Sequence, residues 1–280
     1  MTTLIDDYSR SPMTLSDAEL VEQHRMLRKL QDRKRAANSL SSLSRYVFQV
    51  EPAHHHLIWI EALEALFAGE FRRLLAIAPP GHAKSTYHSI VFPTWYLGHN
   101  YNHTLIGVTT TEGLGRLYGD TVRTVVEQSR EFAAVFPGVV PDKVRGWGQT
   151  GFFVKGPRGR PRGQKDASMI FTGAGGPVIG RRADGVIIDD AVDEATARSE
   201  TLLEQRKVWI RRSVFSRLKP DGWRILAGTL WAEGDVVDSA MQTGEYVTIH
   251  MAAQSDGNVV DADVWVPNGV SWRPSKGVQA

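Results

Sequence analysis

The segment Leu74–Thr86, with the sequence LLAIAPPGHAKST, constrains the fold of this chain more than any other. An apolar run typical of a β-strand ends in a short turn-forming loop, and a Lys-Ser-Thr then opens a stretch that can be helical. In such a strand–loop–helix unit, backbone N–H groups and a helix N-terminus face a bound phosphate. Lys84 would add a positive charge there, and the Ser85 hydroxyl could bind Mg²⁺. The segment therefore predicts a phosphate-binding loop.

The loop differs from the usual pattern, G-x-x-x-x-G-K-[ST], at two places. Glycine is usual at positions 78 and 83, and both are alanine in this chain. Only Gly81 keeps the conformational freedom that lets a backbone approach a ligand closely. Because loosened motifs match many unrelated loops, the segment alone leaves open whether it binds a nucleotide.

A second segment, Gly185–Asp190, is an apolar, β-branched run that ends in two carboxylates. Strands buried on both faces have this composition, and an α/β sheet binds its ligands at the carboxyl ends of such strands. In a phosphate-loop enzyme the first carboxylate, here Asp189, binds Mg²⁺, and the second, Asp190, polarises the attacking water. A buried strand followed by a solvated turn has the same pattern. The joint occurrence with the Lys84 loop, in the right chain order, favours a nucleotide site.

Further segments predict the rest of the fold. Residues 104–108 and 223–229 read as strands, and residues 114–126 follow a helical pattern. Strands that alternate with helices indicate an α/β fold, with a mainly parallel sheet and helices on both faces. The strand–helix unit between the phosphate loop and Asp189 is expected of the additional-strand, RecA-like class of P-loop NTPases. Thr229 ends the last of these strands, at a position that commonly senses the γ-phosphate in such enzymes.

Four segments of the chain resemble the large terminase subunit of tailed bacteriophages, the motor that pumps DNA into procapsids. They are HHHLIWIEALEALFAGEFRRLLAIAPP (54–80), APPGHAKST (78–86), GRRADGVIIDDAVDEATARSE (180–200) and RLKPDGWRILAGTLWAEGDV (217–236). In that family they correspond to the helix before the phosphate loop, the proline-bearing loop itself, the second acidic motif, and the third motif with its coupling strand. An arginine is more usual where Leu230 stands. Together these segments lie within about residues 50–240.

The resemblance implies an enzyme that hydrolyses ATP with Mg²⁺, by in-line attack of water on the γ-phosphorus. Ser85 and Asp189 would bind Mg²⁺, and Asp190 would orient or deprotonate the water. Thr229 would couple phosphate release to movement of the C-terminal part. Gln49, or one of the histidines 54–56, would border the adenine. The loop residues that would bind the nucleotide are Pro80, Gly81, His82, Ala83, Lys84, Ser85 and Thr86.

The resemblance also implies an arginine finger, a guanidinium that stabilises charge on the transferring phosphoryl group. Arg145 is the first candidate, because family members place such an arginine after the second helix and before the acidic strand. It lies in a stretch rich in Gly and Arg, residues 139–182, which also contains short strand-like runs at 151–155 and 168–172. We expect this stretch to form a hairpin excursion or a solvated loop. Arg158, Arg160 and Arg162 are rivals that can instead contact DNA phosphates.

The implied partners are double-stranded DNA, the portal protein and the small terminase subunit. The chain would form a homo-oligomeric ring, a pentamer, when assembled at the procapsid portal in the host cytoplasm, or a monomer in isolation. We expect a tail and basic helix over residues 1–45, an ATPase core over 46–250, and a linker over 251–280. Family members carry an additional nuclease domain, which we expect to be absent because too few residues follow Thr229.

The N-terminal region predicts a helix from about Asp17 to Ala37, capped by Thr14 or Ser16. Acidic residues occur early in this helix and Lys and Arg late, which matches the helix dipole and suits a solvated face. The basic end can also contact DNA or a neighbouring subunit. The resemblance to a ring motor favours the neighbour.

Composition excludes several classes of protein. The chain contains no cysteine, so it has no disulfide framework and no thiolate metal site. No run approaches the ~18 apolar residues that a membrane-spanning helix needs, and the polar, acidic start does not read as a signal peptide. The formal net charge is only +2, so a DNA-binding surface must come from local clustering of charge. The histidines at 54–56 follow one another on one helical turn and cannot converge on one metal ion.

Two other functions are weighed against the motor. One is a small-molecule phosphotransferase of the same fold, which would need an Arg-rich lid and an acceptor pocket; the double Asp followed by Thr229 argues against it. The other is a non-enzymatic assembly module that docks to a portal or partner. Its best support is the loss of glycine at Ala78 and Ala83.

Overall fold

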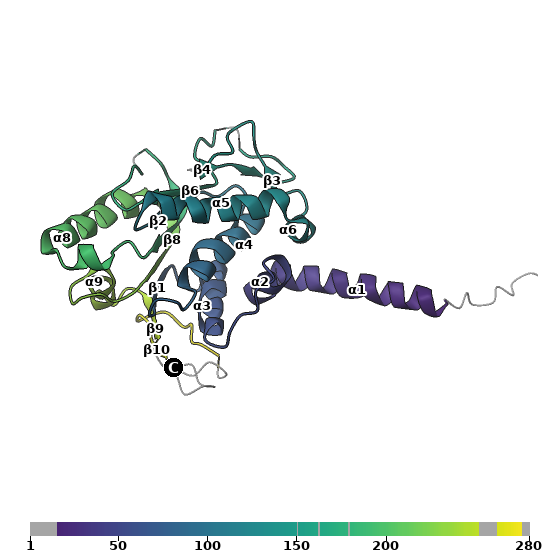
Figure 1. The fold of residues 1–280 in the computed structure, drawn as a ribbon, viewed down its shortest axis with the longest axis horizontal. Coiled ribbons are helices and arrows are strands. Elements are labelled where there is room, and N and C mark those ends of the chain that lie inside the picture. The colour runs from purple at the N-terminus through teal and green to yellow at the C-terminus, as the bar shows by residue number, and fades with distance from the viewer. Residues whose placement is uncertain (1–15, 150, 162, 179, 252–261, 276–280) are drawn as a thin grey trace, which may run out of the picture.

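An eight-stranded sheet forms the centre of the computed structural model, which describes residues 16–149, 151–161, 163–178, 180–251 and 262–275 (Figure 1). The strand order is β10-β9-β1-β8-β7-β2-β6-β4. The strands from β9 to β6 in that order are parallel, and β10 and β4 pair antiparallel at the two edges. Their bounds are β1 Arg73–Ile77, β2 Leu105–Thr109, β4 Gly151–Phe152, β6 Met169–Gly173, β7 Ala183–Asp189, β8 Leu218–Gly228, β9 Val247–Met251 and β10 Ala262–Trp265.

The central strands are apolar on both faces because helices cover both sides of the sheet. In β1, Leu74 and Ala76 pack into one buried cluster, and Leu75 and Ile77 pack into the other. This division follows from the two-residue repeat of a strand, which turns successive side chains to opposite faces. The α/β fold with a mainly parallel sheet, predicted from the sequence, is what the structure has.

The helices divide between the two faces. One face packs against α2 (Leu40–Val47), α3 (His56–Ala68), α4 (Phe92–His99), α5 (Glu112–Gln128) and α6 (Arg130–Val135). The other packs against α8 (Glu200–Trp209), η2 (Ile210–Val214) and α9 (Val236–Gln242). The shorter elements are the π-helical η1 (Thr86–Val91), the 3-10 turn η3 (Phe215–Arg217), α7 (Glu194–Ala197), and a two-stranded ribbon of β3 (Val140–Pro141) and β5 (Val154–Lys155).

Helix α1 (Asp17–Asn38) extends away from the body of the protein (Figure 1). Ser16 caps it in a capping box with Glu19, whereas the alternative cap, Thr14, lies outside the described residues. Only its C-terminal end is anchored: Ala36 is buried in the main core, and the Trp95 indole donates a hydrogen bond of 2.9 Å to the Ala37 carbonyl. Ala36, Leu40 and Leu43 all lie in the main core, so the core begins before the boundary expected at residue 46.

Two stretches expected to be loops contribute strands to the sheet. Within residues 139–182, the strand-like run at 168–172 corresponds to β6, which pairs in parallel with β2 along its whole length, so this part is neither a hairpin excursion nor a solvated loop. Within residues 251–280, β10 pairs with β9, and Trp272 is buried against Phe71. Among the described residues, no helix combines the length and the hydropathy that a bilayer crossing requires.

Candidate active site

Three neighbouring strands end together at one edge of the sheet and gather the polar residues of the site. β8 lies between β1 and β7, with Ile77 paired with Gly228 and Asp189 paired with Ala227. The loop after β1, Thr229 after β8, and the two aspartates at the end of β7 are therefore brought side by side. The carboxyl ends of parallel strands are where α/β sheets bind ligands.

The loop after β1 holds two residues in left-handed backbone conformation. Gly81 has φ of 84° and Ala83 has φ of 55°. Such a conformation costs a residue with a β-carbon about 1–2 kcal/mol relative to glycine. This explains why glycine is usual before the lysine of such loops, and it means that Ala83 takes up the conformation that the missing glycine would favour. Thr86 then begins η1, so the loop leads directly into a helical turn.

Exchanging alanine and glycine in this loop tests that geometry. We expect Gly81→Ala to lower the free energy of unfolding by about 1–2 kcal/mol, because it places a β-carbon at positive φ. Ala83→Gly should leave it unchanged or raise it by up to about 1 kcal/mol, because released strain offsets the added backbone entropy of the unfolded chain. Urea denaturation of both variants measures this. A loss of stability in Ala83→Gly would contradict the left-handed conformation.

Lys84 is buried, with 4% of its surface exposed, and its ammonium points back into the site. Its Nζ donates hydrogen bonds to the carbonyl oxygens of Ala78 (2.7 Å) and Pro79 (3.1 Å), and to Thr229 Oγ1 (3.1 Å). Burial lowers the pKa of Lys84, and the nearby carboxylates of Asp190 and Asp189 oppose this shift. The positive charge is thus held at the junction of the loop, β8 and β7.

Asp189 is almost wholly buried, with 1% of its surface exposed. Its Oδ2 accepts a hydrogen bond of 2.6 Å from Ser89 Oγ, whereas Oδ1 has no hydrogen-bond partner in the described structure. Burial raises the pKa of Asp189 to about 6, although the Ser89 hydrogen bond acts in the opposite direction. A buried carboxylate oxygen without a donor is costly, and a bound cation would remove that cost. Asp189 therefore fits the predicted role of metal ligand.

Ser89 was not among the residues predicted from the sequence. It lies on η1, four residues after Ser85, so one helical turn places both hydroxyls on the same side. The hydroxyl of Ser85, like that of Ser89, lowers the pKa of Asp189. The spacing S-x-x-x-S after the phosphate loop was the signal that could have identified Ser89.

The buried charge of Asp189 predicts a pH-dependent stability. Its pKa is raised from 3.8 to about 6, so folding is favoured when the group is protonated, and this contribution is lost as the pH rises through about 6. The full loss corresponds to about 3 kcal/mol, at about 1.4 kcal/mol per pKa unit. We expect Asp189→Asn, which carries no charge, to be more stable than the unmodified chain at neutral pH and similar to it near pH 4. Urea denaturation in the presence of chelator at both pH values measures the difference in the free energy of unfolding. An equal increase for Asp189→Asn at both pH values would contradict the prediction.

Asp190 adopts a left-handed conformation, with φ of 46°, directly after the strand. Its Oδ1 accepts a hydrogen bond of 3.1 Å from the backbone N–H of Thr229, and Thr110 Oγ1 donates to its backbone carbonyl. Burial raises the pKa of the Asp190 carboxyl, and Lys84 lowers it. Aspartate tolerates this backbone region better than most residues. The tight turn therefore favours Asp over the longer Glu at this position.

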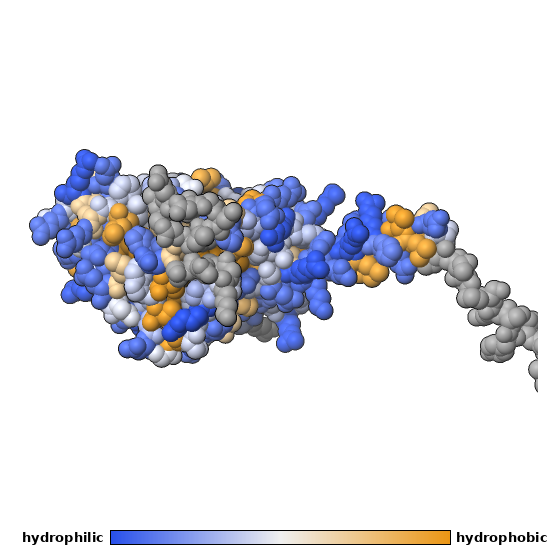
Figure 2. Space-filling model, turned by 90° about the horizontal axis from the view of Figure 1, so that it is seen from below, coloured by the Kyte–Doolittle hydropathy of each residue, from blue (hydrophilic) through white to orange (hydrophobic). Residues whose placement is uncertain are grey.

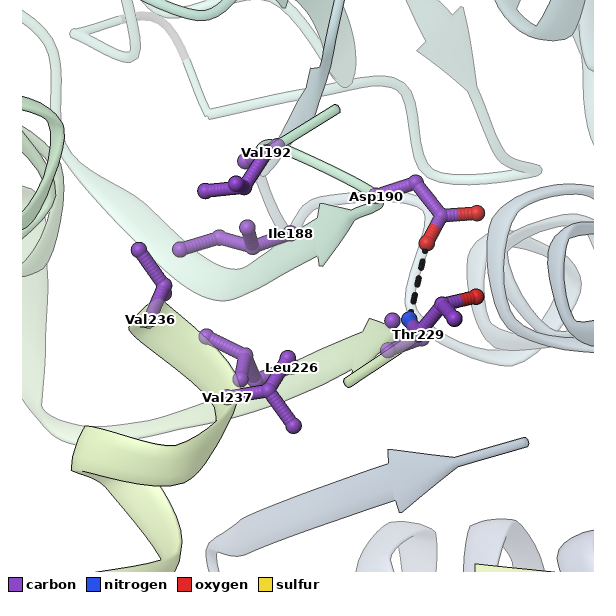
Figure 3. Close-up of a pocket in the computed structure, with 10 residues that line it drawn as sticks. Ile188, Asp190, Val192, Leu226, Thr229, Val236 and Val237 are labelled. Carbon is purple, nitrogen blue, oxygen red and sulfur yellow. Dashed lines mark hydrogen bonds between the residues drawn. The ribbon is translucent and has the colours of Figure 1, made fainter. Parts of the chain in front are cut away.

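Apolar side chains pack beside Asp190 and Thr229. Figure 3 shows Ile188 and Leu226 directed toward Val236 and Val237 of α9, to one side of the hydrogen bond between Asp190 and Thr229. Asp190 and Thr229 are thus fixed to each other on a packed base. Such support restricts the freedom of functional side chains.

A cluster of aromatic rings packs around the loop after β1. The ring of His82, at the loop tip, lies 5.6 Å from that of His55, and His56 packs on Tyr87 with centroids 4.7 Å apart. Burial lowers the pKa of His56 to about 4. Gln49 is exposed, with φ of 56°, in the turn after α2. No hydrogen bond from Gln49 to the loop is recorded in the described structure, so its contact with adenine stays a prediction.

Arg145 does not reach the site of its own chain. Its guanidinium donates hydrogen bonds to the carbonyls of Gln164 (3.0 Å) and Pro161 (3.4 Å) and lies 3.7 Å from the Asp142 carboxylate. These contacts close the excursion between β3 and β6. Arg145 therefore stabilises this loop in the structure. Its role as an arginine finger toward a neighbouring subunit stays a prediction.

The rival arginines differ from one another. Arg160 is buried, and its guanidinium donates to the carbonyls of Tyr101 and Val154 at 3.1 Å each. These bonds make it a structural residue of the excursion. Arg158 is exposed, and Arg162 lies outside the described residues.

A cavity of about 500 Å³ lies at the carboxyl ends of β2 and β6. Thr110 and Glu112 line one side, and the Gly-rich turn 173–177 with Arg181 lines the other. Thr110 also donates its hydroxyl hydrogen bond to the Asp190 carbonyl. Thr110, which was not among the residues predicted from the sequence, therefore contacts both the cavity and Asp190.

Comparisons with known proteins add little to this geometry. No protein-family model matches the chain, and no curated protein matches its sequence. One matching solved structure is S. cerevisiae Dbp5 bound to Gle1 and IP6, with 15% sequence identity and a TM-score of 0.47. The match covers 76% of this chain and 50% of that chain. A likeness of this degree carries no argument about function, which must come from the site itself.

Proposed function

We propose that this chain is the ATPase domain of a phage terminase large subunit, which hydrolyses ATP to drive double-stranded DNA into a procapsid. One observation carries the proposal. The buried Lys84 ammonium, from the loop after β1, and the Asp190 carboxylate, after β7, both form hydrogen bonds with Thr229 at the end of a third strand. The buried carboxylate of Asp189, which has an unpaired oxygen, directly precedes Asp190. The position of β8 between the loop strand β1 and the aspartate strand β7 supports the additional-strand class of P-loop NTPases.

Lys84 would bind the β- and γ-phosphates. Its ammonium is already desolvated and held by the carbonyls of Ala78 and Pro79. An incoming phosphate offers charged acceptors in place of these neutral ones, and hydrogen bonds between charged groups are the stronger kind. The loop amides and the start of η1 would complete the phosphate contacts.

Ser85 and Asp189 would hold Mg²⁺, which fits the unpaired Oδ1 of Asp189. When bound, the metal neutralises charge on the phosphates and orients them. Ser89 would keep the Asp189 carboxylate in place through its 2.6 Å hydrogen bond. The pKa of Asp189, raised by burial, would fall again as the cation compensates the carboxylate charge.

Asp190 would orient the attacking water and accept its proton. Its Oδ1 is engaged by the Thr229 N–H, so the second oxygen is the one that can face the water. Thr229 touches Asp190, Lys84 and the Ala78 carbonyl at once, through its N–H and its hydroxyl. A change at the γ-phosphate would therefore alter the hydrogen bonds of Thr229 and shift the end of β8 and the segment that follows it.

The proposal includes the partners that the resemblance implies: DNA, a portal protein and a small subunit, with assembly as a homo-oligomeric ring at the procapsid in the host cytoplasm. An arginine finger in trans would be part of that assembly. Arg145 remains a candidate for it only if its contacts to Gln164 and Pro161 are released on assembly.

The deciding experiment measures phosphate release from ATP and Mg²⁺ at increasing concentrations of double-stranded DNA. We expect hydrolysis that DNA stimulates. Hydrolysis that DNA leaves unchanged, with phosphate transferred to small hydroxyl-bearing acceptors, would indicate a phosphotransferase instead. Nucleotide binding without any hydrolysis, in a preparation with a native circular dichroism spectrum, would indicate a non-catalytic assembly module.

A further inference from the structure

Helix α1 exposes apolar side chains along the part that extends from the body. Every residue from Ser16 to Asp32 is exposed. The exposed fractions are 40% for Leu20, 60% for Met26, 49% for Leu27 and 57% for Leu30. Figure 2 shows these apolar surfaces among the hydrophilic ones on the extended helix. Contact of these apolar side chains with water is unfavourable, so we infer that a partner covers them.

The spacing of these residues is that of a two-helix seam. Leu20 and Leu27 are seven residues apart, and Leu30 follows three residues later, so they occupy a and d positions of a heptad repeat. Gln23 takes the remaining d position, and Met26 flanks the seam at g. The fifth exposed apolar residue, Val21, falls outside the seam, on another face of the helix.

Charge along α1 is divided between its two halves. Residues 17–24 carry three carboxylates and neither Lys nor Arg, whereas residues 25–38 carry six cationic side chains and one carboxylate. The acidic residues are Asp17, Glu19, Glu22 and Asp32, and the basic ones are Arg25, Arg28, Lys29, Arg33, Lys34 and Arg35. A parallel pair of such helices would place like charges together. An antiparallel pair would place the acidic half of each against the basic half of the other, and complementary charges fix partner and orientation.

We propose that two copies of this chain associate through α1 as an antiparallel pair. Leu20 of one copy packs against Leu30 of the other, and Gln23 packs against Leu27. Met26 meets Met26 of the second copy at the twofold axis, and Glu19 lies beside the other copy's Arg33. This contact is isologous, since the same surface serves both copies. It does not depend on the proposed ATPase function.

The fold leaves room for this pair. The axis falls near Met26, and the buried part of the helix begins at Ala36, ten residues further on. At about 1.5 Å per residue, the two bodies would lie about 30 Å apart along the helix direction. The pairing segments therefore meet before the bodies can collide.

The chain lacks cysteine, so single cysteines report the pairing directly. Under oxidising conditions, we expect Met26→Cys to form disulfide-linked dimers. Leu20→Cys and Leu30→Cys should each remain unlinked alone and should link when mixed. Val21→Cys is the control, because Val21 is 67% exposed on the same helix but lies outside the seam. Linking of Leu20→Cys to itself would indicate a parallel pair, and linking of Val21→Cys as fast as Met26→Cys would indicate random collision; either result overturns the proposal.

Sedimentation equilibrium of the full chain gives an independent test. The unmodified chain should dimerise at micromolar concentrations, less strongly as salt is added. Leu27→Glu should be monomeric while keeping its helical circular dichroism. A chain that stays monomeric throughout would overturn the proposal. So would a Leu27→Glu variant with unchanged sedimentation and weakened DNA binding, which would identify nucleic acid as the partner of this face.

Discussion

Replacing Lys84 by alanine is expected to lower the rate of ATP hydrolysis by at least about 100-fold, or about 2.7 kcal/mol of transition-state stabilisation. The physical reason is the position of the ammonium, which is desolvated and held at 2.7–3.1 Å from the Ala78 carbonyl, the Pro79 carbonyl and the Thr229 hydroxyl. Charge that grows on the γ-phosphate in the transition state would have no comparable counter-charge in the variant. Steady-state phosphate release with saturating ATP and Mg²⁺ measures the effect.

Two further variants make this result specific. Lys143→Ala removes an exposed lysine that forms a surface ion pair with Glu127, and it should hydrolyse ATP at the normal rate. Lys84→Arg keeps the charge but replaces a compact ammonium by a larger planar group, so it should also be strongly impaired. Thermal melting must accompany these assays, because Lys84→Ala removes the ammonium that donates to the Pro79 carbonyl and leaves the Ala78 carbonyl with the Thr229 hydroxyl alone. Normal turnover in a folded Lys84→Ala variant would remove the basis of the site.

The sequence was sufficient to predict the elements whose pattern is local. The strand before the phosphate loop, the helix of residues 114–126, the acidic strand and the strand before Thr229 are all found, as β1, α5, β7 and β8. Each of these is an uninterrupted apolar or periodic run, and such runs reflect burial directly. Asp189, Lys84 and Thr229 were predicted to share a site because parallel strands end at the same edge, and the structure brings them together.

What the sequence could not predict depends on contacts between distant segments. β10 lies next to a stretch rich in Gly, Pro and charged residues, which suggests a loop, and only pairing with β9 makes it a strand. The strand-like run that forms β6 is visible in the sequence, but its place beside β2 in the main sheet is not. Arg145 looked available for catalysis because a sequence does not show hydrogen bonds to the carbonyls of Gln164 and Pro161.

The backbone conformation of the phosphate loop and the orientation of Ser89 could not be predicted from the sequence for the same reason. The alanine at position 83 seemed to weaken the phosphate-loop pattern, yet the residue adopts the left-handed conformation that glycine usually supplies. The contribution of Ser89 appears only because η1 turns its hydroxyl toward Asp189. Residue types in a motif therefore predicted which groups lie at the candidate site, and the folded backbone decided which others support them.

Neutralising the two neighbouring aspartates should separate metal binding from the chemical step. In Asp189→Asn, the side-chain oxygen can still accept the Ser89 hydrogen bond, but the charge at the unpaired position is lost. We expect weaker binding of Mg²⁺–ATP, and turnover that falls with it. In Asp190→Asn, the amide oxygen can keep the hydrogen bond from the Thr229 N–H, so the loop and the nucleotide should stay in place. The amide cannot take a proton from water, so turnover should fall by about 10²–10⁴-fold.

Titration of each variant with ATP in the presence and absence of Mg²⁺, followed by single-turnover hydrolysis, distinguishes the two effects. In Asp189→Asn the affinity for ATP should become nearly independent of Mg²⁺, because the site has lost the carboxylate that makes the metal favourable. In Asp190→Asn the Mg²⁺ dependence of binding should match that of the unmodified chain, and only the rate of the chemical step should drop. An equal loss of Mg²⁺–ATP affinity in both variants would show that the roles are wrongly assigned. The buried oxygen of Asp189 would then need another explanation than a metal ion.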